Sequence, residues 1–176
     1  MAYENIKIDY RDTPEKFRET ADEVISFLVD HLLELTTIET ECIQLMAYVE
    51  KGIHIKGKPR DPKGVWALYK QRYGEAISTF CSEGLISRGY AQSMNHYGDS
   101  ADACESAQKR LRGKYAYLVH SCELAITMKS AKRAVIEISF HDLYHGERQF
   151  TLKYTDQWQL TDKRIKLDGK WRRDYI

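Results

Sequence analysis

The stretch RAVIEISFHDLYHGERQFTLKY, residues 133–154, predicts two β-strands joined by a turn. Apolar side chains alternate with polar ones on both sides of Gly146, a residue that tolerates the positive φ of hairpin turns. Because successive side chains of a strand point to opposite faces, this period of two predicts strands with one buried face. The expected inward residues are Ala134, Ile136, Ile138, Phe140, Phe150, Leu152 and Tyr154.

The same alternation extends in both directions, so we predict one antiparallel sheet over residues 114–176. Upstream, the even positions from Ala116 to Met128 are expected to face inward, and a hairpin turn is predicted at Asp168-Gly169. Downstream, the inward pattern is carried by Trp158, Leu160, Ile165, Leu167 and Trp171.

A sheet with one apolar face needs a cover, and residues 13–113 are predicted to supply helices for it. Thr13-Pro14 opens a long amphipathic helix. Thr36 and Glu39 match a capping box, so a break there would give a helical hairpin ending at Gly52, and continuation as one bent helix is also possible. Asp61-Pro62 opens the next helix in the same manner as the first.

The expected fold is therefore α+β, a single domain over residues 1–176 in which the helices from Pro14 and Pro62 pack into the concavity of a bent sheet. The segment 6–10 alternates too briefly to choose between an edge strand and an ordered arm. A short helix is predicted to end at Gly113, before the sheet begins.

Composition limits the classes of function. The formal net charge is +1, with 27 basic and 26 acidic residues, so no global field attracts nucleic acid or an anionic membrane. The chain has no apolar run of membrane-spanning length, and we expect a cytoplasmic protein. The four cysteines are widely spaced in apolar stripes, which favours buried thiols over disulfides.

His120 and Cys122 lie two positions apart on one predicted strand face, a spacing that can present two ligands to a metal. Since a zinc site needs further ligands that the spacing does not supply, a core histidine and a core thiol are the favoured interpretation. A general base at His120 would need a carboxylate partner, and Glu123 falls on the opposite face. We therefore expect no metal, no cofactor and no catalytic residues.

Two segments carry a resemblance to a known family. One is Tyr73 through Phe80-Cys81, and the other runs from Phe150 through the ending Asp168-Gly169-Lys170-Trp171-Arg172-Arg173-Asp174. With helices first and a twisted antiparallel meander last, the chain resembles the NTF2-like superfamily, whose fold is a cone of helices on a curved sheet. More narrowly, these segments resemble bacterial NTF2-fold immunity proteins of Rhs-type and other polymorphic toxin systems.

The resemblance implies a protein that neutralises a cognate toxin domain by covering its active surface and performs no chemistry. The partner-binding residues expected to meet a basic toxin are Glu34, Glu39, Glu41 and Glu50. The alternative is a small-molecule enzyme or ligand-binding protein that uses the cavity of the cone. The residues expected to line that cavity are His120, Cys122 and Trp171, with Trp171 closing the cone.

Overall fold

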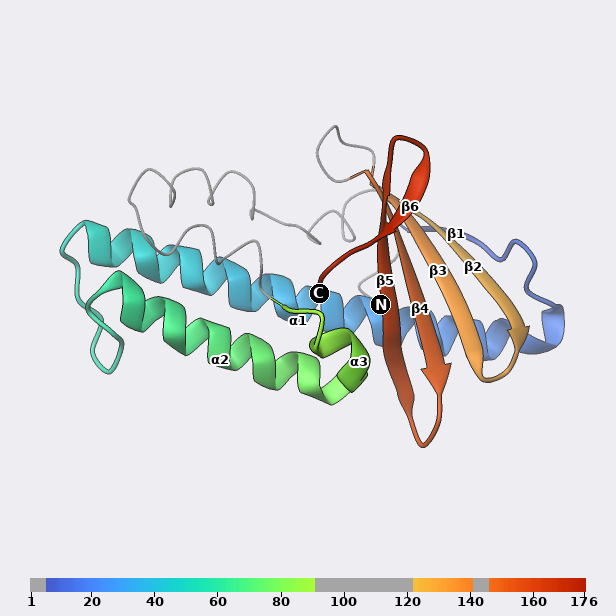
Figure 1. Cartoon of the computed structure of the whole chain (residues 1–176), viewed down its shortest axis with the longest axis horizontal. Coiled ribbons are helices and arrows are strands. Elements are labelled where there is room, and N and C mark those ends of the chain that lie inside the picture. The colour runs from blue at the N-terminus through green and yellow to red at the C-terminus, as the bar shows by residue number, and fades with distance from the viewer. Residues whose placement is uncertain (1–5, 91–121, 141–145) are drawn as a thin grey trace.

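The computed structural model describes residues 6–90, 122–140 and 146–176 (Figure 1). Its helical elements are η1 (Glu15–Phe17, a 3-10 turn), α1 (Arg18–Glu50), α2 (Pro62–Phe80) and α3 (Glu83–Ile86). Its strands are β1 (Lys7–Asp9), β2 (Cys122–Ser130), β3 (Arg133–Phe140), β4 (Glu147–Tyr154), β5 (Trp158–Leu167) and β6 (Lys170–Arg173). The α+β class predicted from the sequence is confirmed.

The strands form one sheet in the order β1-β2-β3-β4-β5-β6 within the described part of the chain. Each neighbouring pair from β2 to β6 is antiparallel, as the alternation predicts. The segment after Ile6 is an edge strand, β1, and it pairs with β2 in parallel. The β5–β6 hairpin turns at Asp168 and Gly169, whose φ values of 51° and 72° are those of the predicted tight turn.

The first long helix is continuous. α1 spans 33 residues without a break, so of the two alternatives at Thr36 the continuous helix is the one found. The Thr36 hydroxyl donates to the carbonyl of Leu32, 3.0 Å away, rather than capping a new helix. Glu39 is fully buried in mid-helix, because the apolar stripe of α1 continues past both residues.

α2 turns back along the second half of α1, and the two helices form a hairpin (Figure 1). The Asp61 carboxylate caps α2 by accepting from the Gly64 N–H at 2.9 Å, as predicted. Only part of the predicted packing is present, since α1 lies against the sheet whereas α2 packs mainly on α1 and reaches the sheet at β5. The free end of the hairpin, residues 51–61, therefore projects away from the sheet.

A β-bulge in β5 changes which residues face the helices. Leu160 pairs with Leu152 and Asp162 with Thr151, so Thr161 is an extra residue and the alternation shifts by one. After Trp158 and Leu160, the next fully buried residue is Lys163.

The end of the chain differs from the expectation. Leu167, predicted inward, has the same parity along β5 as Lys163 but is 44% exposed at the end of the strand. Trp171 pairs with Lys166 on the outer face of the sheet, the face away from α1, and is half-buried, so it closes no core. Tyr154, also predicted inward, is exposed at the end of β4.

Candidate functional site

The residues expected to line a cavity do not meet. Cys122 faces the core and is buried, which raises the pKa of its thiol to about 11. Trp171 lies on the outer face, where the Lys166 ammonium stands 5.5 Å from the centre of its ring. His120 lies outside the described residues. Cys122 and Trp171 are thus on opposite faces of the sheet and share no cavity.

The four glutamates of α1 occupy different surroundings. Glu34 and Glu41, two turns apart, share one face. Glu41 accepts a hydrogen bond from Arg72 of α2 at 2.5 Å, whereas Glu34 is exposed and lines a groove of about 450 Å³ between the two helices. Glu50 is exposed at the end of α1, and Glu39 is fully buried. Glu39 therefore offers no surface to a partner, and the four residues do not form one acidic face.

A buried polar cluster lies on the inner face of β5, where sequence patterning predicts apolar residues. The fully buried Lys163 ammonium lies 3.0 Å from a carboxylate oxygen of Asp174 and donates to the carbonyl of Tyr175. Arg148 reaches the same oxygen of Asp174 at 3.5 Å. Burial lowers the pKa of Lys163, and the negative charges of Asp174 and Glu39 oppose that shift. These contacts fasten the chain end to the sheet.

This cluster escapes sequence reasoning because a lysine in an alternating strand is ordinarily placed on the solvent face. The bulge at Thr161 turns Lys163 inward. Its trace in the sequence is the change of the apolar residues from even positions, ending at Leu160, to odd positions, beginning at Ile165. An amine in such a place can act as a base or nucleophile when neutral. Here its hydrogen bonds go to Asp174 and Tyr175, so its role in this structure is to anchor the chain end.

Much of the outer face of the sheet carries paired charges. Glu137 accepts from Arg11 at 2.6 Å and from Gln149 at 2.9 Å. Burial alone would raise the pKa of Glu137, but these two donors outweigh it and the net pKa is lowered. Lys166 and Glu147 are 2.9 Å apart on the neighbouring strands. Charged side chains that are paired in this way already have partners, so this part of the outer face offers few unpaired charges to a ligand.

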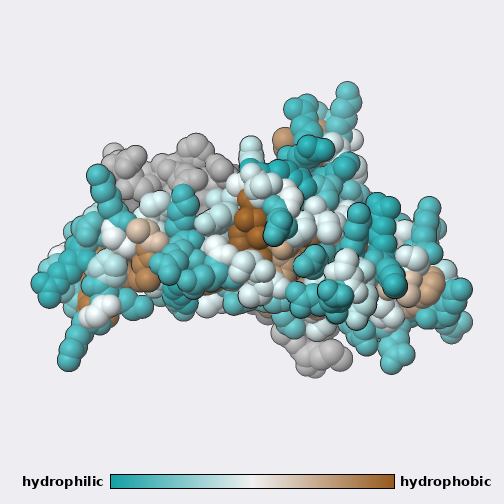
Figure 2. All heavy atoms as spheres, turned by 60° about the horizontal axis from the view of Figure 1, so that its bottom comes forward, coloured by the Kyte–Doolittle hydropathy of each residue, from teal (hydrophilic) through white to brown (hydrophobic). Residues whose placement is uncertain are grey.

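The free end of the helical hairpin has the opposite character. Tyr48, Ile53 and Ile55 are 43%, 47% and 41% exposed, and we call them the tip surface. Tyr48 and Ile55 line a hollow of about 260 Å³ whose edge includes Glu41 and Lys58. Figure 2 shows apolar atoms among hydrophilic ones at this end of the molecule. Residues 50–63, which form the loop and its flanks, carry five cations and two acidic residues: Lys51, Lys56, Lys58, Arg60 and Lys63 with Glu50 and Asp61.

Comparison with protein-family models, curated proteins and solved structures finds no match to this chain. No helix in the described ranges is both long and apolar enough to cross a membrane. Nor do those ranges contain a group of three or more histidine, cysteine, aspartate or glutamate side chains placed to hold a metal ion. Because three large apolar side chains are exposed together at the tip surface, we take it as the candidate functional site.

Proposed function

We propose that this chain is a cytoplasmic immunity protein that binds and neutralises a cognate polymorphic toxin, and that its helices and sheet form an NTF2-like cone. The sequence resemblance of the segments at Tyr73–Cys81 and Phe150–Asp174 supports the family. The observation that carries the binding function is the tip surface, where large apolar side chains are exposed together at the end of a projecting hairpin.

The tip surface has the composition of an interface centre. Aromatic and aliphatic anchors that enter a partner's pocket contribute most of the affinity, while a polar rim excludes water. Burying the exposed part of one of the tip isoleucines contributes roughly 1–2 kcal/mol by apolar area. The lysines of the loop, such as Lys58 at the edge of the hollow, add attraction to a negatively charged patch on the toxin.

The affinity required of an inhibitor sets how much more is needed. Nanomolar binding corresponds to about −12 kcal/mol, more than the tip anchors supply alone. The groove along Glu34 and the pair of Glu41 with Arg72 extend the same side of the hairpin and enlarge the contact area. A toxin that covers both the tip and the groove would reach an interface of ordinary size.

Co-expression tests the proposal. Cells that produce the toxin domain encoded beside this chain's gene are expected to survive when the chain is present, and the purified pair is expected to co-elute. Ile55→Ser should weaken the complex by at least about tenfold, a loss of roughly 1.4 kcal/mol. Leu167→Ser is the matched control, because Leu167 is equally exposed but lies on β5.

The outcomes separate cleanly. Docking at the tip surface is supported if Ile55→Ser abolishes survival and co-elution while Leu167→Ser preserves both. A folded chain that does not bind the folded toxin domain overturns the immunity function. If Ile55→Ser binds the toxin as tightly as the wild type does, the immunity function stands but the docking surface lies elsewhere on the protein.

A second candidate function, binding or converting a small molecule inside the cone, draws on Lys163, since burial lowers the pKa of this amine. A screen of small carbonyl compounds by thermal shift tests it. Stabilisation that disappears in Lys163→Met, while that variant remains folded, would favour the second candidate over the first.

A further inference from the structure

At the end of the outer face nearest the β2–β3 turn, three cations stand on adjacent strands. They are Lys129 on β2, Arg133 on β3 and Lys153 on β4, and we call them the cationic row. The sheet register places Arg133 directly opposite Lys153. In the part of the chain that the structure describes, no ion pair joins any of the three to a carboxylate.

This arrangement breaks a local rule of sheet stability. Like charges directly opposite each other on neighbouring strands destabilise a sheet, and opposite charges in the same positions stabilise it. Elsewhere on the outer face, Lys166 contacts Glu147 on the neighbouring strand. Arg164 also stands opposite a like charge, Arg173, but the Asp162 carboxylate lies 2.7 Å from Arg164 and offsets the repulsion. Among the described residues, Arg133 and Lys153 have no such carboxylate, and a local conflict left uncompensated favours a binding function.

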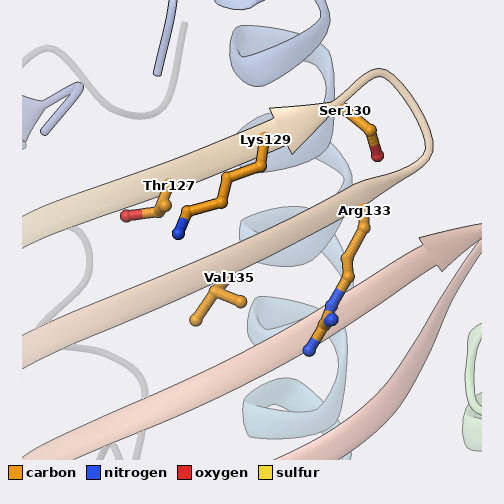
Figure 3. A pocket seen from close by; sticks show the side chains of 5 residues that line it. All are labelled: Thr127, Lys129, Ser130, Arg133 and Val135. Carbon is orange, nitrogen blue, oxygen red and sulfur yellow. The ribbon is translucent and has the colours of Figure 1, made fainter. Parts of the chain in front are cut away.

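The cationic row borders a shallow pocket of about 330 Å³. Its lining combines the Lys129 and Arg133 side chains with the hydroxyls of Thr127 and Ser130 and the methyl groups of Val135. Figure 3 shows these side chains rising from β2 and β3. The pocket thus offers charged and neutral hydrogen-bond donors around a small apolar floor, a combination that suits carboxylates.

We propose that the cationic row binds an acidic segment of a partner polypeptide. Adjacent strands are about 4.8 Å apart, so cations on three strands span roughly 10 Å, wider than a single oxyanion. Glutamate or aspartate residues at alternate positions of an extended segment are about 6.8 Å apart and meet such a row in sequence. Arg133 binds one carboxylate through two parallel hydrogen bonds. Lys129 and Lys153 bind the neighbouring carboxylates of the segment as point charges.

A lone phosphate fits the site less well. Proteins that hold phosphate usually supply several backbone N–H groups from a helix N-terminus or a turn. Around Arg133 the backbone is paired with β2 and with β4, so the donors of the pocket are side chains. The cationic row and the tip surface lie at different ends of the molecule, and acidic-segment binding does not depend on the proposed toxin.

Fluorescence anisotropy with a labelled peptide tests this proposal. The probe is a peptide of about eight residues that alternates glutamate and alanine, and its glutamine counterpart is the uncharged comparison. At about 50 mM salt we expect a dissociation constant near 10–100 μM, weakening strongly by about 300 mM because exposed charges are screened. The full chain is used throughout, and circular dichroism confirms that each variant is folded.

Two charge-reversed double variants of equal net charge test whether the peptide binds at the cationic row. Arg133→Glu with Lys153→Glu is expected to lower affinity at least tenfold, whereas Lys170→Glu with Arg172→Glu on β6 should leave it within about twofold. The single change Arg133→Glu creates an opposite-charge pair with Lys153 and should raise the denaturant midpoint while it lowers peptide affinity. A gain in stability together with a loss of peptide affinity would indicate that the cationic row is kept for binding rather than for folding.

Other results overturn the proposal. No glutamate-peptide binding at millimolar concentration, or equal losses in both double variants, would show that the row has no specific role. Binding of the glutamine peptide with similar affinity would exclude charge recognition. Tripolyphosphate that binds more tightly than the peptide, with loss in Arg133→Glu and Lys153→Glu, would instead identify an oxyanion site.

Discussion

Replacing Lys163 by methionine probes the buried anchor of the chain end. Methionine keeps most of the volume of the lysine side chain, so the change removes the ammonium without leaving a large cavity. The variant loses the contact with Asp174 at 3.0 Å and the hydrogen bond to the carbonyl of Tyr175. It therefore isolates the electrostatic and hydrogen-bonding part of this contact from its packing.

The expected loss follows from the burial of the two partners. Removing one member of a buried ion pair usually costs about 3–5 kcal/mol, because the other charge stays behind without its partner. Asp174 remains 22% exposed and keeps Arg148 at 3.5 Å, which offsets part of that penalty. We expect Lys163→Met to lower the free energy of unfolding by about 2–4 kcal/mol.

Urea unfolding at neutral pH measures the loss, with Lys166→Met as the control on the same strand. Lys166 is 35% exposed and paired with Glu147, and exposed pairs contribute at most about 1 kcal/mol. Lys163→Met should therefore unfold at distinctly lower urea than Lys166→Met. Equal midpoints for the two variants, or a stabilised Lys163→Met, would refute the conclusion that the buried contact holds the chain end.

Alkaline pH gives an independent measurement on the same pair of proteins. Burial lowers the pKa of Lys163 below the value of 10.5 that the unfolded chain retains. Between these two pKa values the unfolded state binds more protons, so stability rises with pH across that interval. The stability advantage of the wild type over Lys163→Met is therefore expected to grow as pH rises from neutral toward 10.5, and a constant difference would contradict it.

Further predictions concern other elements. Trp171→Ala should cost about 1 kcal/mol in urea unfolding, against about 3–5 kcal/mol for a fully buried tryptophan, and a loss above about 3 would place it in the core. Thr13→Val should cost about 2 kcal/mol by the same assay, because its hydroxyl joins the Ile126 carbonyl and the Met128 N–H across a buried contact, at 2.8 and 2.9 Å. Burial raises the pKa of Cys81 to about 12, so mass spectrometry should find it alkylated at pH 8 only after unfolding, and rapid native labelling would show it exposed.

The sequence predicts the strands best where their two faces differ most. In β3, each apolar residue from Ala134 to Ile138 has a polar or half-buried neighbour, and the alternation decides the register unaided. The turn at Asp168-Gly169 is equally legible, since few residue pairs tolerate positive φ at both positions.

The missed features have one cause in β5. An extra residue at Thr161 shifts the alternation of β5 by one position, so that odd-numbered residues after it, Lys163 among them, lie on the inner face. Lys163 therefore moves into the core while Trp171 moves to the outer face. In α1 the sequence left two alternatives open at Thr36, because its hydroxyl can donate within its own helix as readily as it can cap a new one.

The candidate site was only partly visible in the sequence. Exposed apolar side chains such as Ile53 and Ile55 are recognised only once the loop is known to project from the body of the protein. Likewise, the opposition of Arg133 and Lys153 depends on the strand register, which a hairpin of unknown length does not give. Glu39 and Glu50 illustrate the converse, as the helix separates residues that composition groups together.

The placement of the tip surface has a consequence for how the protein changes over generations. α1 is about 50 Å long, and residues 51–60 at its far end contribute no buried side chain. Substitutions at such exposed positions usually alter stability by less than about 0.5 kcal/mol. Mutations in that loop are therefore expected to change the stability of the fold little. Under the proposed function, selection can alter recognition of the partner there while the sheet and its anchor at Lys163 remain unchanged.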